Sequence, residues 1–224
     1  WEFSNENTQY LTHNIHRYSG KFIPQIAKTA IELLTNPGDI ILDPYVGSGT
    51  TLIEAALANR YSLGVDLNPL AVLIAKTKVT PIEKDKTNCL KRVFTDLCES
   101  LDYYFDPTIF EPPLKNIEKL IEEAKLDPRF QEKWYNKWFQ PNVLLQLLVI
   151  KRKIESLEDS RCQDLATVAF SDILRRSSNA HPNYPNVMFD KNAKEKPLPA
   201  KIFLNSLTEC ITMIESLNFQ TFSE

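Results

Sequence analysis

The stretch "IILDPYVGSGTTLIEAA", residues 40–56, decides the fold of this chain. Its first four residues form a short apolar run that ends in an aspartate, a pattern typical of a buried strand. A turn with two glycines follows, and apolar residues at helical spacing begin directly after it. The stretch therefore predicts a strand at 39–43, a tight turn and a helix at about 50–59, with Asp43 at the carboxyl end of the strand.

The segments on either side extend this pattern. Upstream, a helix with Pro24 in its first turn ends at the Asn-Pro-Gly of residues 36–38. Downstream, "YSLGVD" at 61–66 predicts a second strand, after which Asn68 is a predicted N-cap and Pro69 the first residue of another helix. Strand, helix, strand and helix in this order predict a right-handed parallel βαβ unit, which makes this part of the chain α/β.

The pattern changes after Pro81, where only helical periodicity remains. Helices are expected at 86–104, 113–125, 129–139, 142–157 and 161–176, followed by a loop at 179–199 and a helix at 200–217. We therefore expect three parts: an α/β part over residues 1–82, a large all-helical insertion over 83–178, and a loop and helix over 179–224.

The composition excludes several classes of protein. The net charge is −3, so a nucleic-acid contact would have to come from a local basic patch. The four cysteines are widely spaced and form no C-x-x-C pair, which argues against zinc and disulfides and favours a reducing, cytoplasmic location. His13 and His16 lack acidic or cysteine partners at ligand spacing, so no metal site is expected. The longest apolar run, at 143–150, is too short to span a membrane.

The glycine-containing turn has the features of a nucleoside-binding crevice. Gly47 and Gly49 allow positive φ angles and close approach of the backbone. The helix that begins near Thr50 directs its unpaired N–H groups toward the turn. Asp66 ends the second strand, where a carboxylate beside the first strand could accept hydrogen bonds from a ribose.

The kind of nucleoside follows from what the turn lacks. No third glycine follows Gly49 at the spacing of the dinucleotide fingerprint, and no lysine follows as in a P-loop. Asp43, directly before the turn, would repel a pyrophosphate but suits a cationic ligand such as the amino group and sulfonium of S-adenosylmethionine. The alternative is a turn whose glycines serve packing alone.

Three segments together resemble a known enzyme family. "DPYVGSGTT" at 43–51 and "GVDLNPLA" at 64–71 are similar to motif I and the acidic motif of S-adenosylmethionine-dependent DNA amino-methyltransferases, which modify adenine N6 or cytosine N4. "LTHNIHRYSGKFIPQIA" at 11–27 resembles the segment called motif X that precedes motif I in that family. The resemblance covers about residues 8–82. It implies a Rossmann-like methyltransferase sheet, S-adenosylmethionine as cofactor, and double-stranded DNA with a flipped target base as partner.

The resemblance also implies roles for individual residues. Asp43 would face the methionine amino group, Gly47 and Gly49 would let the backbone approach the cofactor, and Asp66 would accept from the ribose hydroxyls. Leu67 and Asn68 would lie along the adenine, while Phe22 would close the pocket. The expected cofactor-binding residues are Tyr18, Phe22, Asp43, Pro44, Tyr45, Gly47, Ser48, Gly49, Thr50, Asp66, Leu67 and Asn68.

The catalytic motif of the family is not found in this sequence. That motif is Asp, Asn or Ser, then Pro-Pro, then an aromatic residue, and it accepts hydrogen bonds from the target amine and stacks on the base. The nearest strings, "EPPL" at 111–114 and "HPNYP" at 181–185, do not supply these groups. We therefore expect no catalytic residue here, a sheet that is incomplete in this chain, and a segment that is inactive unless the motif follows residue 224.

Two regions are candidates for contact with nucleic acid. Arg175 and Arg176 end a helix and run into a polar loop, so we expect them to contact DNA. "RFQEKWYNKWF" at 129–139 interleaves aromatic and basic residues, but the helical spacing of Trp134 and Trp138 favours a place in the core.

The sequence thus predicts a site-specific DNA methyltransferase segment, with cytosine N4 slightly favoured over adenine N6 as target. One alternative is an RNA guanosine-N2 methyltransferase, because "GSGTTLIEAA" at 47–56 also resembles that family. The other is a non-catalytic module that binds S-adenosylmethionine and interacts with partners.

Overall fold

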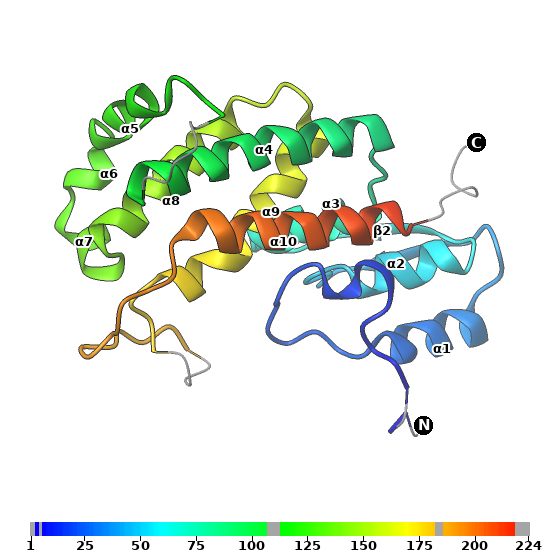
Figure 1. Cartoon of the computed structure of the whole chain (residues 1–224). Coiled ribbons are helices and arrows are strands. Elements are labelled where there is room, and N and C mark those ends of the chain that lie inside the picture. Colours follow the sequence, from blue (N-terminus) through cyan, green and yellow to red (C-terminus); the bar gives the residue numbers. More distant parts are fainter. Residues whose placement is uncertain (1–2, 5, 107–112, 182–185, 218–224) are drawn as a thin grey trace. The chain divides into compact units, whose positions relative to one another are not determined.

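The computed structural model describes residues 3–4, 6–106, 113–181 and 186–217 (Figure 1). Much of the two strings weighed above as a catalytic motif, namely residues 111–112 and 182–185, lies outside the described residues. The chain forms two compact units. The first contains residues 1–83 and 209–224, and the second contains residues 84–208.

The first unit carries the predicted βαβ pattern. Its elements in chain order are the 3-10 helix η1 (Leu11–Asn14), α1 (Pro24–Leu34), β1 (Ile40–Asp43), α2 (Thr50–Leu57), β2 (Tyr61–Gly64) and α3 (Pro69–Val79). Strands β1 and β2 are parallel, with Ile40 opposite Tyr61 and Asp43 opposite Gly64. The parallel strand pair joined by a helix is therefore confirmed, and the sheet in the described part of the chain has two strands.

Local sequence explains where these helices begin. Pro24 is the first residue of α1, where its missing N–H has no helical partner to lose. The side chain of Asn68 accepts a hydrogen bond from the backbone N–H of Leu70 at 3.0 Å and caps α3, whose first residue is Pro69. These two starts, and the beginning of α2 at Thr50, lie where the sequence predicts them.

One face of the two-stranded sheet is covered and the other is open. Ile41 packs against Ala27 and Ile31 of α1 and Ala55 of α2, and α1 and α2 lie side by side (Figure 1). On the opposite face the apolar side chains are 61–71% exposed; they are Ile40, Leu42, Tyr61 and Leu63. Because alternate residues of a strand point to opposite faces, these four form one exposed apolar surface.

The second unit is helical, apart from an isolated antiparallel bridge between Ala180 and Phe189. Its helices are α4 (Lys84–Phe105), α5 (Ile117–Lys125), α6 (Pro128–Gln131), α7 (Lys133–Trp138), α8 (Pro141–Glu155), α9 (Ser160–Ser177) and the first part of α10 (Pro199–Glu215). The single helix predicted at 129–139 is wrong, because Glu132 adopts an extended conformation with ψ of 126° and separates α6 from α7.

Helix α8 forms much of the core of this unit. It contains the apolar run at 143–150, in which all eight side chains are buried. The one polar residue of the run, Gln146, is fully buried, and its Oε1 accepts a hydrogen bond from the backbone N–H of Ala200 at 3.0 Å. Among the helices that the structure describes, none combines the length and apolar character needed to cross a membrane.

Candidate functional site

Two backbone N–H groups of the turn between β1 and α2 donate hydrogen bonds to the residues that directly follow β2. The N–H of Val46 donates to the carbonyl of Val65 at 2.9 Å, and the N–H of Gly47 donates to Oδ2 of Asp66 at 2.9 Å. Gly47 and Gly49 have φ angles of +49° and +82°, which favour glycine. The turn and the second strand therefore form one edge, as expected where two parallel strands end together.

Two carboxylates flank this edge and are half-buried. Asp43 accepts hydrogen bonds from the backbone N–H of Tyr45 at 3.1 Å and from Oγ1 of Thr51 at 2.5 Å. Asp66 accepts from Gly47 and, through Oδ1, from the backbone N–H of Asn68 at 2.8 Å. A carboxylate can accept about four hydrogen bonds, so each can serve the turn and still accept from a ligand.

The two glycines of the turn have different surroundings. A Cβ atom at Gly49 would lie 2.8 Å from Cα of Ala75 in α3, closer than real Cβ contacts, so the missing side chain lets α2 approach α3. A Cβ at Gly47 would meet Cε1 of Tyr18 at 3.5 Å, which is ordinary contact. Close packing against α3 therefore explains the glycine at position 49. At position 47 the positive φ favours glycine, and the predicted cofactor-binding residue Tyr18 lies beside it.

The other predicted site residues divide into exposed and buried side chains. Tyr45 is 87% exposed and Leu67 is fully exposed, and Pro44 and Asn68 are exposed as well. The side chains of Ser48 and Thr50 are buried and face the protein interior. A ligand at this edge would therefore meet the side chains after each strand and the backbone of the turn.

Phe22 lines a cavity of about 290 Å³. Ile26 and Ile31 of α1, Ile41 of β1 and Thr51 of α2 also line this cavity. Phe22 is 42% exposed. Tyr18 thus lies close to Gly47, and Phe22 shares its cavity with Thr51, whose hydroxyl donates a hydrogen bond to Asp43.

A buried polar network beneath the turn was missed by the sequence analysis. Glu54 of α2 accepts a hydrogen bond from the hydroxyl of Tyr10 at 2.6 Å and lies 2.7 Å from Nε2 of His13. Lys78 of α3 is fully buried, and its Nζ donates to the carbonyl of His13 at 3.3 Å and to Oγ of Ser48 at 3.4 Å. The network joins the segment before Tyr18 to both helices. The sequence feature that could have revealed this network is Lys78, a charged residue on the apolar face of α3.

Burial changes the titration of this network. Desolvation, with a smaller contribution from the nearby charge of Lys21, lowers the pKa of Lys78 to about 7. Desolvation also lowers the pKa of His13 below its usual value, although the hydrogen bond to Glu54 acts in the opposite direction. Within the described residues, no group of three or more His, Cys, Asp or Glu side chains could hold a metal ion.

Replacing Lys78 with methionine should flatten the dependence of stability on pH. Above pH 7 the unfolded chain keeps a proton on Lys78 that the folded chain loses, until both are neutral above the ordinary lysine pKa of 10.5. In this window Lys78 makes the free energy of unfolding rise with pH by about 1.4 kcal/mol per unit. Urea denaturation between pH 7 and pH 9 should show this rise in the wild type and a smaller rise in Lys78→Met. The exposed Lys76, on the same helix, provides the control variant Lys76→Met, and equal slopes in all three proteins would contradict the assignment.

The predicted nucleic-acid residues lie in the second unit. Arg175 and Arg176 are exposed in the last turn of α9. Arg175 lines a cavity together with Trp134 and Trp138 of α7. The expectation that Trp134 belongs to the core is wrong, because its side chain is 60% exposed. The short α7 has no buried residue, and its other two aromatic side chains, Tyr135 and Trp138, are half-buried.

Comparison with known proteins connects these features to a family. A family model described as DNA methylase, of the N6/N4 type, matches residues 1–77. The Type II methyltransferase M.MvaI of Kocuria varians is 33% identical over 184 residues, which are 81% of this chain and 37% of that protein. The Type II methyltransferase M.MjaII of Methanocaldococcus jannaschii is 36% identical over 53% of this chain and 22% of its own length. No solved structure matches.

The chain spans 37% or less of the length of these curated relatives. The matched residues 1–77 include the motif X-like segment, the glycine turn and the strand end at Asp66, so the resemblance drawn from the motifs is confirmed. These residues of the chain match the N6/N4-type DNA methylase family, and the chain is similar to Type II methyltransferases.

Proposed function

We propose that this chain is the S-adenosylmethionine-binding part of a site-specific DNA methyltransferase, with Asp43, Gly47 and Asp66 holding the cofactor. One observation carries the proposal. The hydrogen bond from Gly47 to Asp66 joins the turn after β1 to the end of β2, and it sets two carboxylates at one edge of a parallel strand pair. Ligands of α/β sheets bind at this edge.

The chemistry of the site fits this cofactor. The methionine ammonium and the ribose hydroxyls are hydrogen-bond donors, and Asp43 and Asp66 have acceptor capacity left for them. The negative charge of Asp43 also complements the sulfonium. Leu67 and Asn68, exposed after β2, supply a surface for the adenine, and Tyr18 supplies an aromatic wall beside Gly47.

The proposed reaction is transfer of a methyl group to an exocyclic base amine, cytosine N4 or adenine N6. When bound, S-adenosylmethionine would supply the methyl group for the exocyclic amine of a flipped base and would leave as S-adenosylhomocysteine, with one amine proton released to water. In this chain Asp43, Gly47 and Asp66 would bind and orient the methyl donor. No catalytic role is assigned to any of residues 1–224. The relatives are Type II methyltransferases, which supports DNA over RNA as the substrate.

A Rossmann-like sheet is part of the same proposal. The four exposed apolar side chains on the open face of β1 and β2 are at positions that a doubly wound sheet covers with further helices. Two parallel strands alone leave this apolar face in contact with water, which is unfavourable, so the face favours a covering layer.

Calorimetric titration of the chain with small ligands tests the cofactor assignment. We expect S-adenosylmethionine and S-adenosylhomocysteine to bind, and NAD and ATP not to bind, because Asp43 repels a pyrophosphate. The same preparation should transfer no methyl group to DNA, since the catalytic tetrapeptide does not occur in the sequence. Binding of NAD or ATP without binding of S-adenosylmethionine would reject the proposal.

A further inference from the structure

A cavity of about 300 Å³ lies on the helical unit, outside the cofactor site. Trp134, Trp138 and Phe139 line it together with Leu174, Arg175 and Val187. These residues come from α7 and the residue after it, from the end of α9, and from the described segment that begins at residue 186. The volume is at the lower limit for small-ligand pockets, so the cavity suits one flat ring system better than a helix.

The aromatic rings around this cavity are partly exposed. Trp134 and Trp138 have ring centroids 6.2 Å apart, and Trp138 packs edge-on against Phe189 at 5.6 Å. Trp134 is 60% exposed and Val187 66% exposed, so this surface is not closed by the rest of the unit. An exposed indole beside a cavity offers a face on which another planar ring can stack.

The two sequence segments that supply most of the lining residues are mostly positively charged. Residues 133–139 and 171–196 contain seven Lys and Arg against three Asp and Glu, although the whole chain has a net charge of −3. The basic segment after Phe189 is held near α7, since the backbone N–H of Asp190 donates to the carbonyl of Asn179 at 2.8 Å and Asn179 donates to that of Trp138 at 2.7 Å. A local basic surface of this kind attracts phosphate.

We propose that this cavity binds an unstacked nucleobase of a DNA strand, with Arg175 at an adjoining phosphate. Stacking on Trp134 supplies the affinity for the base, and the surrounding Lys and Arg side chains supply the attraction to the backbone. The inference rests on the proposed function only in the choice of DNA as partner. It adds a base-binding site on the helical unit that has no residue in common with the proposed cofactor site.

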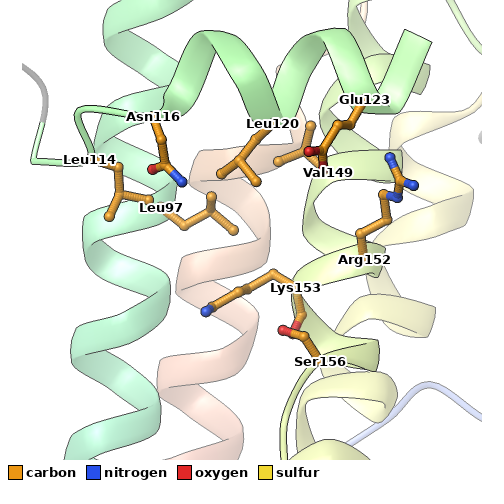
Figure 2. A pocket seen from close by; sticks show the side chains of 9 residues that line it. All are labelled: Leu97, Leu114, Asn116, Leu120, Glu123, Val149, Arg152, Lys153 and Ser156. Atoms are coloured by element: carbon orange, nitrogen blue, oxygen red, sulfur yellow. The ribbon is translucent and has the colours of Figure 1, made fainter. Parts of the chain in front are cut away.

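A second cavity of the same unit provides the contrast. It has a volume of about 330 Å³ and is lined by residues of α4, α5 and α8. Figure 2 shows Arg152 beside Glu123, and Lys153 pointing toward the side of the cavity where Leu97 lies. Its lining includes two basic side chains, the acidic Glu123 and several apolar side chains, but no aromatic ring. Basic charge alone would therefore favour both cavities, whereas base stacking favours the cavity at Trp134 alone.

Anisotropy of a labelled single-stranded oligothymidylate of about eight nucleotides, titrated with the chain, measures this binding. Trp134→Ala should weaken it about tenfold, the loss expected for one stacked base, and Trp134→Phe should restore most of it. Arg175→Gln should weaken binding and lower its salt dependence by about one phosphate contact. The controls are Leu126→Ala, which removes a side chain that is 82% exposed in the same unit, and Arg152→Gln in the second cavity; neither should change the affinity.

Three results would overturn the proposal. An abasic strand of equal length could bind as tightly as oligothymidylate, or Trp134→Ala could bind like the wild type. The chain could also form a dimer that Trp134→Ala dissociates, which would assign the cavity to a second copy.

Titration with S-adenosylmethionine separates this inference from the proposed function. A chain that binds the cofactor but no oligothymidylate refutes the cavity assignment alone, and the reverse result refutes the cofactor assignment alone.

Discussion

Replacing Asp66 with alanine should lower the affinity of the chain for S-adenosylmethionine about a hundredfold or more. Hydrogen bonds to a charged group contribute about 1.5–3 kcal/mol each, and the proposed ribose contact uses two. The variant also loses the bond from Gly47 that joins the turn to β2, so the remaining ligand contacts are less well ordered. Calorimetry measures the loss directly.

Two further variants separate binding from folding. Asp66→Asn keeps one acceptor oxygen for the turn but removes the charge, and it should bind the cofactor weakly while remaining folded. Asp39 accepts a hydrogen bond from the backbone N–H of Asn36 at 2.8 Å, at the opposite end of β1 from the proposed site. Asp39→Ala therefore removes a turn-capping carboxylate directly before the same strand and should leave the affinity unchanged. Wild-type affinity in Asp66→Ala would show that the ligand does not bind at this edge.

Replacing Gly49 with alanine should lower the free energy of unfolding by about 2–5 kcal/mol. Its φ of +82° disfavours any side chain, and the added Cβ would lie 2.8 Å from Cα of Ala75. Because that neighbour is backbone, it can move only if α3 moves away from α2. Urea denaturation of the variant and the wild type measures the difference.

Gly38 provides a matched control for this substitution. Its φ of +89° is close to that of Gly49, but a Cβ there would have no atom within 4 Å. Gly38→Ala should therefore show only the backbone effect, about 1–2 kcal/mol. The difference between the two variants isolates the contact of α2 with α3. If both lose the same stability, the close approach of Ala75 has no energetic consequence.

The buried network connects the packing of the first unit to the proposed site. His13 and Tyr10 reach Glu54 on α2, and Lys78 on α3 reaches both His13 and Ser48 of the turn. Charged and polar groups buried in this way are favourable only when their hydrogen bonds are made. The network therefore holds the motif X-like segment in the position where Tyr18 lies against Gly47.

Local sequence determined the elements of the first unit and the place of its proposed site. The N-cap at Asn68, Pro24 at the start of α1 and the glycine turn before Thr50 all act within a few residues, so their effects can be read directly from the chain. The aspartates after each strand were predictable for the same reason, because parallel neighbouring strands end at one edge. The motifs also sufficed for the family.

Only the tertiary structure decided the contacts between distant residues. Ala75 as the neighbour of Gly49, the burial of Lys78 and the exposure of Trp134 depend on how helices pack, and periodicity in one helix does not specify its partners. The hydrogen bond from Thr12 to the carbonyl of Lys78 joins residues 66 positions apart. The sequence alone therefore predicted which residues are candidates for binding a cofactor, and long-range packing decided which of these candidates are exposed at the edge of the sheet and which are buried.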